Sequence, residues 1–289
     1  LSPERTDTSG TVRMPVLRVK VQDGSRLDVE DTEITFDTYM PAGYSFWLGP
    51  TALKLGLMAV QSTEDESQLK LQGLTLNTSN LLQDKLVQSG LDAQLQQLEM
   101  PSLQAKDLAL SMQFKNWDAD WVNQLMLWLQ SGTQTPAIDW QSSLPALLAG
   151  KPELAISRLS MQSADGPVTF SARIAYTGSQ PEAFNPAADL EGQLRTTLPL
   201  PTLVQLLETK VRNDYLALLE QMNHALAEEE LQAAVDDGVS KRLKALLSQG
   251  AVLQQGDTVE AALEFAHGEF KLNNRPQTLQ QLLGIGSGL

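Results

Sequence analysis

The sequence predicts an α+β protein: a large, curved, mostly antiparallel β-sheet with helices packed on one side, including a long helical block at residues 201–249. Two observations predict this class. Apolar and polar residues alternate through several long segments, as they do in half-buried antiparallel strands. Other segments repeat apolar residues at steps of three and four, as amphipathic helices do. With 289 residues, of which 42% are hydrophobic and 19% charged, the chain is long enough to bury a core.

The first predicted strands lie near the start of the chain. VLRVKVQ (16–22) and DVEDTEITF (28–36) both alternate, and Asp23-Gly24-Ser25 between them is a turn sequence. The same unit of two alternating segments around a polar turn recurs at 53–78, 95–114 and 153–178. The units are too dissimilar for a repeat protein. They predict one large sheet that is curved or split into two parts.

Two shorter helices are predicted inside this pattern. In WDADWVNQLMLWL (117–129), one helical stripe contains Trp121, Leu125 and Trp128, with Asp118 placed to cap the helix and Gly132 to end it. A second helix of one or two turns is predicted at 143–152. These helices are expected to cover the sheet.

The longest helical pattern runs from residue 199 to Gly250. About fifty residues is too long for an ordinary globular helix, so two helices are expected, with a break near 227–230 or near 236–238. After Gly250 the chain predicts a closing hairpin around His267-Gly268, with Asn273-Asn274 as a turn and Asn273 facing outward.

The predicted domain organisation is an N-terminal β-rich region at 12–115 and an α+β region at 116–283 that continues the sheet. Residues 1–11 and 284–289 are expected to be flexible ends. No apolar run reaches the roughly 20 residues of a membrane span. The chain starts with Leu1 rather than Met, so we expect it to be a processed or trimmed product, and the lack of a signal or anchor segment is therefore uninformative.

The charge balance argues against nucleic acid as a partner. Lys and Arg number 21 against 35 Asp and Glu, a net charge of −14, and no basic cluster locally reverses it. The absence of cysteine excludes disulfides, thiolate metal sites and a cysteine nucleophile.

Residues that could support catalysis are few. His224 and Glu228 lie four residues apart, but no third metal ligand accompanies them, and His267 sits at a predicted turn. Acidic pairs such as Asp118 with Asp120 lie at helix starts or turns, where carboxylates are solvated or interact with the helix dipole. The prediction is therefore a non-enzymatic protein without metal or cofactor.

Aromatic residues give the best binding candidates. The first helix is apolar on more than one face, through Trp117, Trp121 and Trp128 with Met126 and Leu127, and Leu125 lies on its stripe. Trp47 lies in a second apolar segment at 39–60. Two interpretations stay open: core packing between helix and sheet, or an apolar groove for an acyl chain or a partner helix.

Four stretches carry a resemblance to a known family: LKLQGLTLNT, LLAGKPELAISRLSMQSADGPVTFSARIAY, LKALLSQGAVLQQGDTVEAALEF and GEFKLNNRP. Over residues 50–283 the chain resembles the YdgA-like proteins, a bacterial family classed as a domain of unknown function. The last stretch is similar to the family's terminal Gly-x-Leu-x-Leu-Asn-Gly-Lys-Pro pattern and departs from it at Asn274 and Arg275. The resemblance implies a periplasmic body tethered to the bacterial inner membrane by one N-terminal helix, an anchor that would be absent from this chain because Leu1 would start partway into the soluble region. The resemblance brings no catalytic residues.

Together these observations predict an envelope protein that binds an apolar or extended, lipid-like ligand or an envelope partner. The alternative is an interaction scaffold that dimerises or docks partners through the 201–249 helices, which would make it a homo-oligomer or a subunit. A third hypothesis, a hydrolase of envelope polysaccharide using two acidic residues, lacks a supporting constellation.

Overall fold

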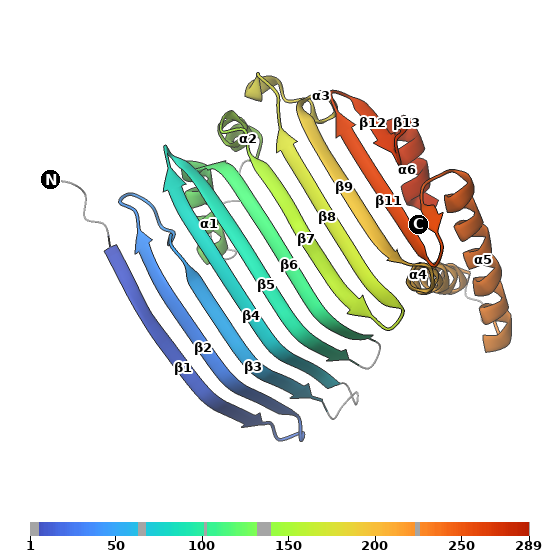
Figure 1. Ribbon diagram of the computed structural model, residues 1–289, viewed down its shortest axis with the longest axis horizontal. Coiled ribbons are helices and arrows are strands. Elements are labelled where there is room, and N and C mark those ends of the chain that lie inside the picture. The colour runs from blue at the N-terminus through green and yellow to red at the C-terminus, as the bar shows by residue number, and fades with distance from the viewer. Residues whose placement is uncertain (1–5, 63–67, 101–102, 132–139, 223–225, 289) are drawn as a thin grey trace.

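The computed structural model describes the chain except for residues 1–5, 63–67, 101–102, 132–139, 223–225 and 289. Within the described residues, thirteen strands form a single antiparallel sheet that does not close (Figure 1). The α+β class and the antiparallel sheet predicted from the sequence are confirmed.

The strands follow one another in space almost in chain order, from β1 to β9 and then β11, β12 and β13, while β10 pairs with β11. Most connections are short, because an antiparallel neighbour can be reached through a tight turn. The helices are inserted in the longer ones, with α1 and α2 between β6 and β7 and with α4 and α5 between β9 and β11. The strand bounds are β1 Thr6–Lys20, β2 Arg26–Met40, β3 Thr51–Gln61, β4 Gln68–Gln83, β5 Leu86–Met100, β6 Leu103–Asp118, β7 Glu153–Ser163, β8 Gly166–Tyr176, β9 Leu190–Pro199, β10 Leu253–Gln255, β11 Thr258–Ala266, β12 Glu269–Leu272 and β13 Arg275–Gln277.

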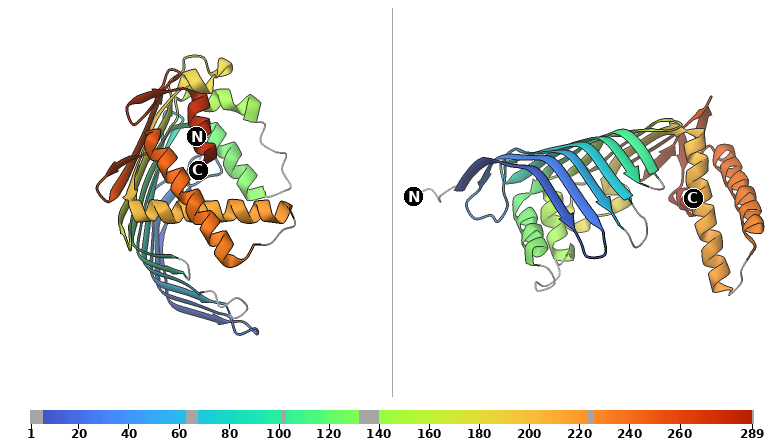
Figure 2. Two further views of the ribbon diagram at one scale, coloured as in Figure 1. Left: turned by 90° about the vertical axis from the view of Figure 1, so that its right-hand side faces the viewer. Right: turned by 90° about the horizontal axis from the view of Figure 1, so that it is seen from below.

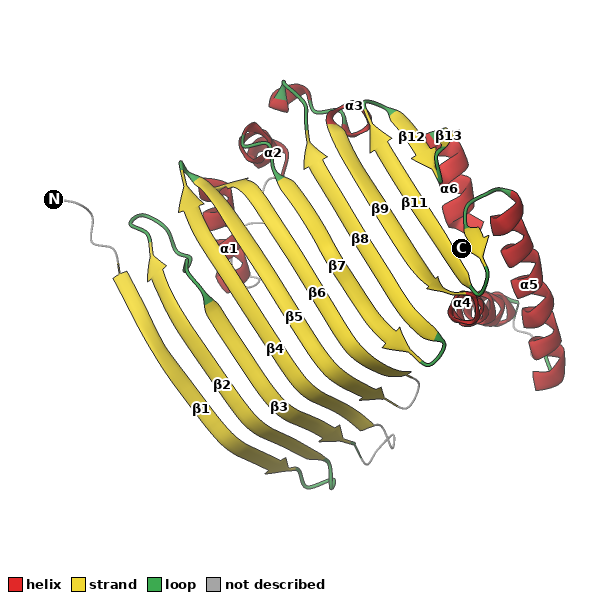
Figure 3. Cartoon of the chain, viewed as in Figure 1, coloured by secondary structure: helices red, strands yellow, loops and turns green. Residues whose placement is uncertain are grey.

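The helices α1, α2, α4 and α5 all lie on the side toward which the sheet curves (Figure 2), as the predicted one-sided packing requires. Figure 3 shows α1 and α2 near the middle strands and α4, α5 and α6 at the end of the sheet opposite β1. The helix bounds are α1 Ala119–Ser131, α2 Trp140–Ala149, α3 Pro186–Asp189, α4 Leu200–Gln221, α5 Glu228–Ser248 and α6 Leu279–Gly288, with a 3₁₀ turn at Pro181–Ala183.

The helix ends follow the predicted caps where the structure describes them. The Oδ1 atom of Asp118 accepts a 2.9 Å hydrogen bond from the backbone N–H of Trp121, which caps α1. The helical block breaks between Gln221 and Glu228, so the first of the two predicted break positions is confirmed. Gly132 and His224 lie outside the described residues.

Two apolar clusters anchor the helices to the sheet. The larger one joins α4 and α5 to β9 and β11, and buries Leu207, Val211, Val235 and Val259. The smaller one packs Phe46 and Leu48, from the loop between β2 and β3, with residues at the start of α1. In the part of the chain that the structure describes, the sheet is therefore covered at two places rather than along its whole length.

The outward orientation predicted for Asn273 is wrong. Asn273 and Asn274 do form the turn between β12 and β13, with positive φ angles of 51° and 63°. The Asn273 side chain, however, is buried with 8% of the residue exposed. Its amide hydrogen-bonds backbone groups at the end of α5 and in β11, which strand alternation alone does not reveal.

Candidate functional site: a concave apolar face

One face of the sheet carries rows of apolar side chains that run across the strands. Residues directly opposite one another in an antiparallel ladder share a face, so the register identifies each row. One row begins with Val12, Ile34, Leu53, Leu76, Ala93 and Leu110 on β1 to β6. It continues through Leu159 of β7 and Phe170 of β8. Apolar residues therefore face the same side over eight neighbouring strands.

This row lies on the side of the sheet that carries the helices. Phe114, which follows Leu110 on the same face of β6, packs edge-on against Trp117 at a centroid distance of 5.3 Å. Trp117 in turn packs against Trp121 of α1, again at 5.3 Å. At the far end, Leu198 of β9 is buried with Leu203 of α4. We call this side the concave apolar face, because the sheet curves toward it (Figure 2).

A line of irregular positions crosses the first six strands. The line contains one residue from each strand, and these residues lie opposite one another without being paired in the register. They are Pro15, Asp31, Gly56, Gly73, Gln96 and Asp107 on β1 to β6. Asp31, Gly73 and Asp107, on alternate strands, have positive φ angles of 53°, 66° and 51°. We call this line the crease.

The apolar pattern slips by one residue at the crease. Same-face residues of a regular strand are two apart, yet here the flanking apolar residues are three apart, as in Met14 and Leu17, Leu55 and Met58, and Leu71 and Leu74. The same spacing recurs between Leu95 and Leu98 of β5 and between Ala105 and Leu108 of β6. In β2 the step runs from Val29 to Thr32. No strand has an extra residue here, since the pairing stays one to one on both sides of the crease. Instead, a residue in the left-handed conformation turns the backbone of every second strand. Because all six strands slip at the same level, the sheet bends there and its apolar side chains stay on one face.

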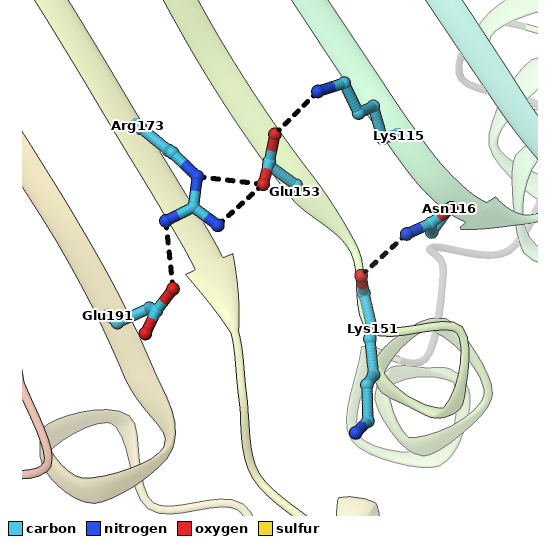
Figure 4. Close-up of polar contacts among 6 residues, drawn as sticks. All are labelled: Lys115, Asn116, Lys151, Glu153, Arg173 and Glu191. Carbon is cyan, nitrogen blue, oxygen red and sulfur yellow. Dashed lines mark hydrogen bonds and ion pairs between the residues drawn. The ribbon is translucent and has the colours of Figure 1, made fainter.

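The opposite face of the sheet is polar and held by ion pairs. Glu153 of β7 accepts hydrogen bonds from Lys115 at 3.0 Å and from Arg173 at 2.8 Å, and Arg173 also binds Glu191 at 2.9 Å (Figure 4). Burial by itself would raise the pKa of Glu153, but the hydrogen bonds from Lys115 and Arg173 outweigh it and hold the pKa below the usual value of a glutamate. The carboxylates of Glu191 and Glu153 in turn raise the pKa of Arg173. These contacts connect four neighbouring strands.

The comparison with family models covers nearly the whole chain. Residues 1–280 match the model described as "Bacterial protein of unknown function (DUF945)". The chain belongs to this family. No curated protein matches the chain. No solved structure matches it either.

The five residues predicted to line a groove have different positions in this DUF945 protein. Trp117 and Trp121 pack edge-on against each other, Trp121 is buried, and Leu125 is half-buried on α1. Trp128 is 38% exposed near the end of α1. Trp47 is 44% exposed, while its neighbours Phe46 and Leu48 are the residues that pack with α1.

Sequence reasoning missed the aliphatic rows as a binding surface. Three of their members stay partly open to solvent: Val12 is 56% exposed, Ile34 37% and Leu159 42%. The signal that could have found them is the three-residue spacing, which recurs at the same level of successive strands. The concave apolar face is therefore wider than the helix-centred groove predicted from the tryptophans.

The described residues offer no constellation for metal chemistry. No group of three or more His, Cys, Asp or Glu in that part of the chain could hold a metal ion. His267 lies in the turn between β11 and β12 with a φ of 51°, as predicted. Among the described helices, none is long and apolar enough to cross a membrane.

Two open hollows lie away from the concave apolar face. One, of about 370 Å³, is lined by Arg173, Glu264 and Lys271. The other lies where β2 to β5 end and includes Arg26 and Asp28, which form a 2.6 Å ion pair. Both hollows are bordered by ion-paired side chains, so the apolar rows are the stronger candidate for a ligand.

Proposed function

We propose that this DUF945 protein is a non-enzymatic envelope protein that binds an apolar, extended, lipid-like ligand on the concave apolar face. One observation carries the proposal: apolar side chains from eight neighbouring strands face the same side, and helices cover that side only in part. A periplasmic body tethered to the bacterial inner membrane is the setting that the YdgA-like resemblance suggests, and it belongs to the same proposal.

The chemistry of the face fits an acyl chain. A hydrocarbon chain needs a long apolar surface and makes no hydrogen bonds, and each CH₂ that it buries contributes about 0.8 kcal/mol. The rows are mostly aliphatic, and the charged side chains of the same strands, such as Glu33 and Lys54, lie on the opposite face. An extended ligand lying across the strands would therefore meet apolar atoms along its length.

The partial exposure of the rows supports the proposal further. Ile34 and Leu159 lie in the same row on β2 and β7, and each exposes more than a third of its surface. Contiguous exposed apolar surface is uncommon on a soluble monomer and marks interaction sites. A lipid chain on this face would remove that surface from water.

Adjacent residues with opposite orientations provide the test. Ile34→Lys adds a charge to the concave apolar face, whereas Thr35→Lys adds the same charge at the next, exposed residue on the opposite face. Delipidated protein is titrated with a fluorescent long-chain fatty acid, and native mass spectrometry tests for a lipid adduct. We expect the wild type and Thr35→Lys to bind alike and Ile34→Lys to bind at least tenfold more weakly. Equal binding by the two variants, or no uptake by the wild type, would refute the proposal.

A second function is favoured by the helical hairpin of α4 and α5, which projects from the sheet (Figure 2). α4 exposes Leu206 and Leu218, which are 59% and 47% exposed, and Met222 directly after the helix is 56% exposed. The hairpin would then dimerise or dock an envelope partner. Light scattering at high protein concentration separates the two functions: a strict monomer with no co-purifying protein argues against the scaffold and leaves the lipid proposal standing.

A further inference from the structure

The outer edge of β1 has no neighbouring strand among the described residues (Figure 1). β1 is 15 residues long and pairs with β2 along nearly its whole length, so its outward backbone groups form an equally long row. Such a row is a template for another strand. Val12 and Val16 on this edge are 56% and 51% exposed.

The residues of β1 that could discourage pairing with another strand do not block its outer edge. Proline and charged side chains discourage edge pairing. Pro15, however, lies at the crease, where the register already skips a position in each of the five strand pairs from β1 to β6. Arg13 binds Glu33 at 2.7 Å and Arg18 binds Glu30 at 3.2 Å, so both arginines turn inward to β2. Pairing at this edge would therefore cost no more at the crease than it does elsewhere in the sheet.

The existing strands of the sheet define the sequence pattern that a strand added beside β1 would need. The strands β2, β4 and β6, which alternate with β1, β3 and β5, place Asp31, Gly73 and Asp107 at the crease in the left-handed conformation. Asp and Gly are residues that adopt this conformation at low cost. Around that residue β4 and β6 read apolar–x–apolar–x–Gly/Asp–apolar–x–apolar, as in Leu69 to Leu76 of β4, and β2 differs from this pattern only in Thr32. A strand beside β1 takes the place of an even-numbered one and needs the same pattern.

A second copy of β1 does not match this pattern. With the two creases aligned, antiparallel self-pairing places Val12 opposite Arg18 and Leu17 opposite Arg13, because the slip is not symmetric about Pro15. Apolar residues would then share a face with arginines in each half of the strand. Pro15 also has a fixed negative φ and cannot supply the left-handed residue.

We propose that the outer edge of β1 binds an antiparallel strand of a partner polypeptide with the pattern apolar–x–apolar–x–Gly/Asp–apolar–x–apolar. The bound strand continues both the crease and the apolar rows beyond Val12 and Leu17. The partner thereby enlarges the concave apolar face. The inference rests on the register of the existing strand pairs and does not depend on the identity of any ligand of that face.

The test uses two labelled peptides and the full chain. The first peptide, LKLQGLTLNT, has the sequence of residues 69–78 and serves as a surrogate strand. The second lacks the glycine and alternates strictly, so only one of its halves can match β1. We expect the first peptide to bind about tenfold more tightly by fluorescence anisotropy, since each mismatched cross-strand pair weakens the ladder. Hydrogen exchange should slow in residues 10–20.

Two variants test the protein side. Val12→Asp places a charge in the apolar row of β1 and should weaken binding of the first peptide, whereas Thr11→Asp, at the next residue on the opposite face, should not. Circular dichroism checks that both variants fold. Equal binding of the two peptides, or protection outside β1, would overturn the inference. Dimerisation of the chain alone with protection of β1 would overturn it as well, because the edge would then accept a second copy.

Discussion

The buried amide of Asn273 should be one of the largest single contributions to the stability of the C-terminal region. Its Oδ1 atom accepts a 2.7 Å hydrogen bond from the backbone N–H of Ala262. Its Nδ2 atom donates to the carbonyl oxygens of Gly250 at 2.8 Å and Ala251 at 3.1 Å. One side chain thus ties the turn after β12 to β11 and to the end of α5.

The change Asn273→Ala leaves three backbone groups without these partners. Each buried group that loses its partner costs about 1–3 kcal/mol, and partial entry of water brings the expected sum to about 3–5 kcal/mol. Alanine also adopts the left-handed conformation of this residue less readily, at about 1 kcal/mol. For a protein of this size each kcal/mol lowers the melting temperature by about 2–4 °C, so a fall of roughly 10 °C or more is expected.

The neighbouring residue provides the matched control. Asn274 has almost the same backbone conformation, with a φ of 63° against 51°, but it is exposed. Asn274→Ala should therefore show the conformational cost alone, about 1 kcal/mol. Differential scanning fluorimetry measures both variants, and hydrogen exchange at Ala262 reports the local effect. If both variants lose the same stability, the buried amide does not hold these segments together and the reasoning fails.

Two further changes probe the sheet. Gly73→Ala and Gly256→Ala share a left-handed backbone, with φ of 66° and 62°, but only at Gly73 would the new Cβ meet a side chain, that of Gln96. Gly73→Ala should therefore lose about 1 kcal/mol more in urea unfolding than Gly256→Ala, and equal losses would argue against close packing at the crease. Glu153→Gln should lower stability by about 1–2 kcal/mol at pH 7. The lowered pKa of folded Glu153 contributes stability that is fully present above the pKa of the unfolded chain and is lost as the pH falls through the folded pKa. The melting temperatures of wild type and variant should therefore converge once the pH lies below the folded pKa. As a control, Glu264→Gln removes an exposed carboxylate and should change neither the stability at pH 7 nor its pH dependence by much. If the melting temperatures of wild type and Glu153→Gln differ by the same amount at all pH values, the role assigned to the Glu153 carboxylate is wrong.

Much of the fold could be predicted because the relevant patterns are local. Alternation marks strands wherever one face is buried, and the segments 53–78 and 153–178 both appear as paired strands. The cap at Asp118 and the break before Glu228 depend on residues within a few positions of one another. Such features need no knowledge of distant neighbours.

The features missed from the sequence depend on distant neighbours. Asn273 is buried because the end of α5 lies against its turn, and nothing in the flanking residues indicates this contact. The candidate site was sought at tryptophans, since aromatic side chains stand out in a sequence that is only 6% aromatic. In one strand, the step from Leu71 to Leu74 resembles a fault in the alternation. Its meaning depends on the equivalent step in the neighbouring strands.

The curvature of the sheet and its apolar face have a common origin in that step. A strand that alternates strictly keeps its apolar residues on one face, but it bends only as far as the normal twist allows. A slip in one strand alone would send the apolar residues beyond it to the opposite face. When six neighbours slip at the same level, with Asp31, Gly73 and Asp107 turning the backbone there, the register survives and the sheet bends. The bend and the continuous apolar rows thus require each other, so a strand that joined β1 without the slip would interrupt both.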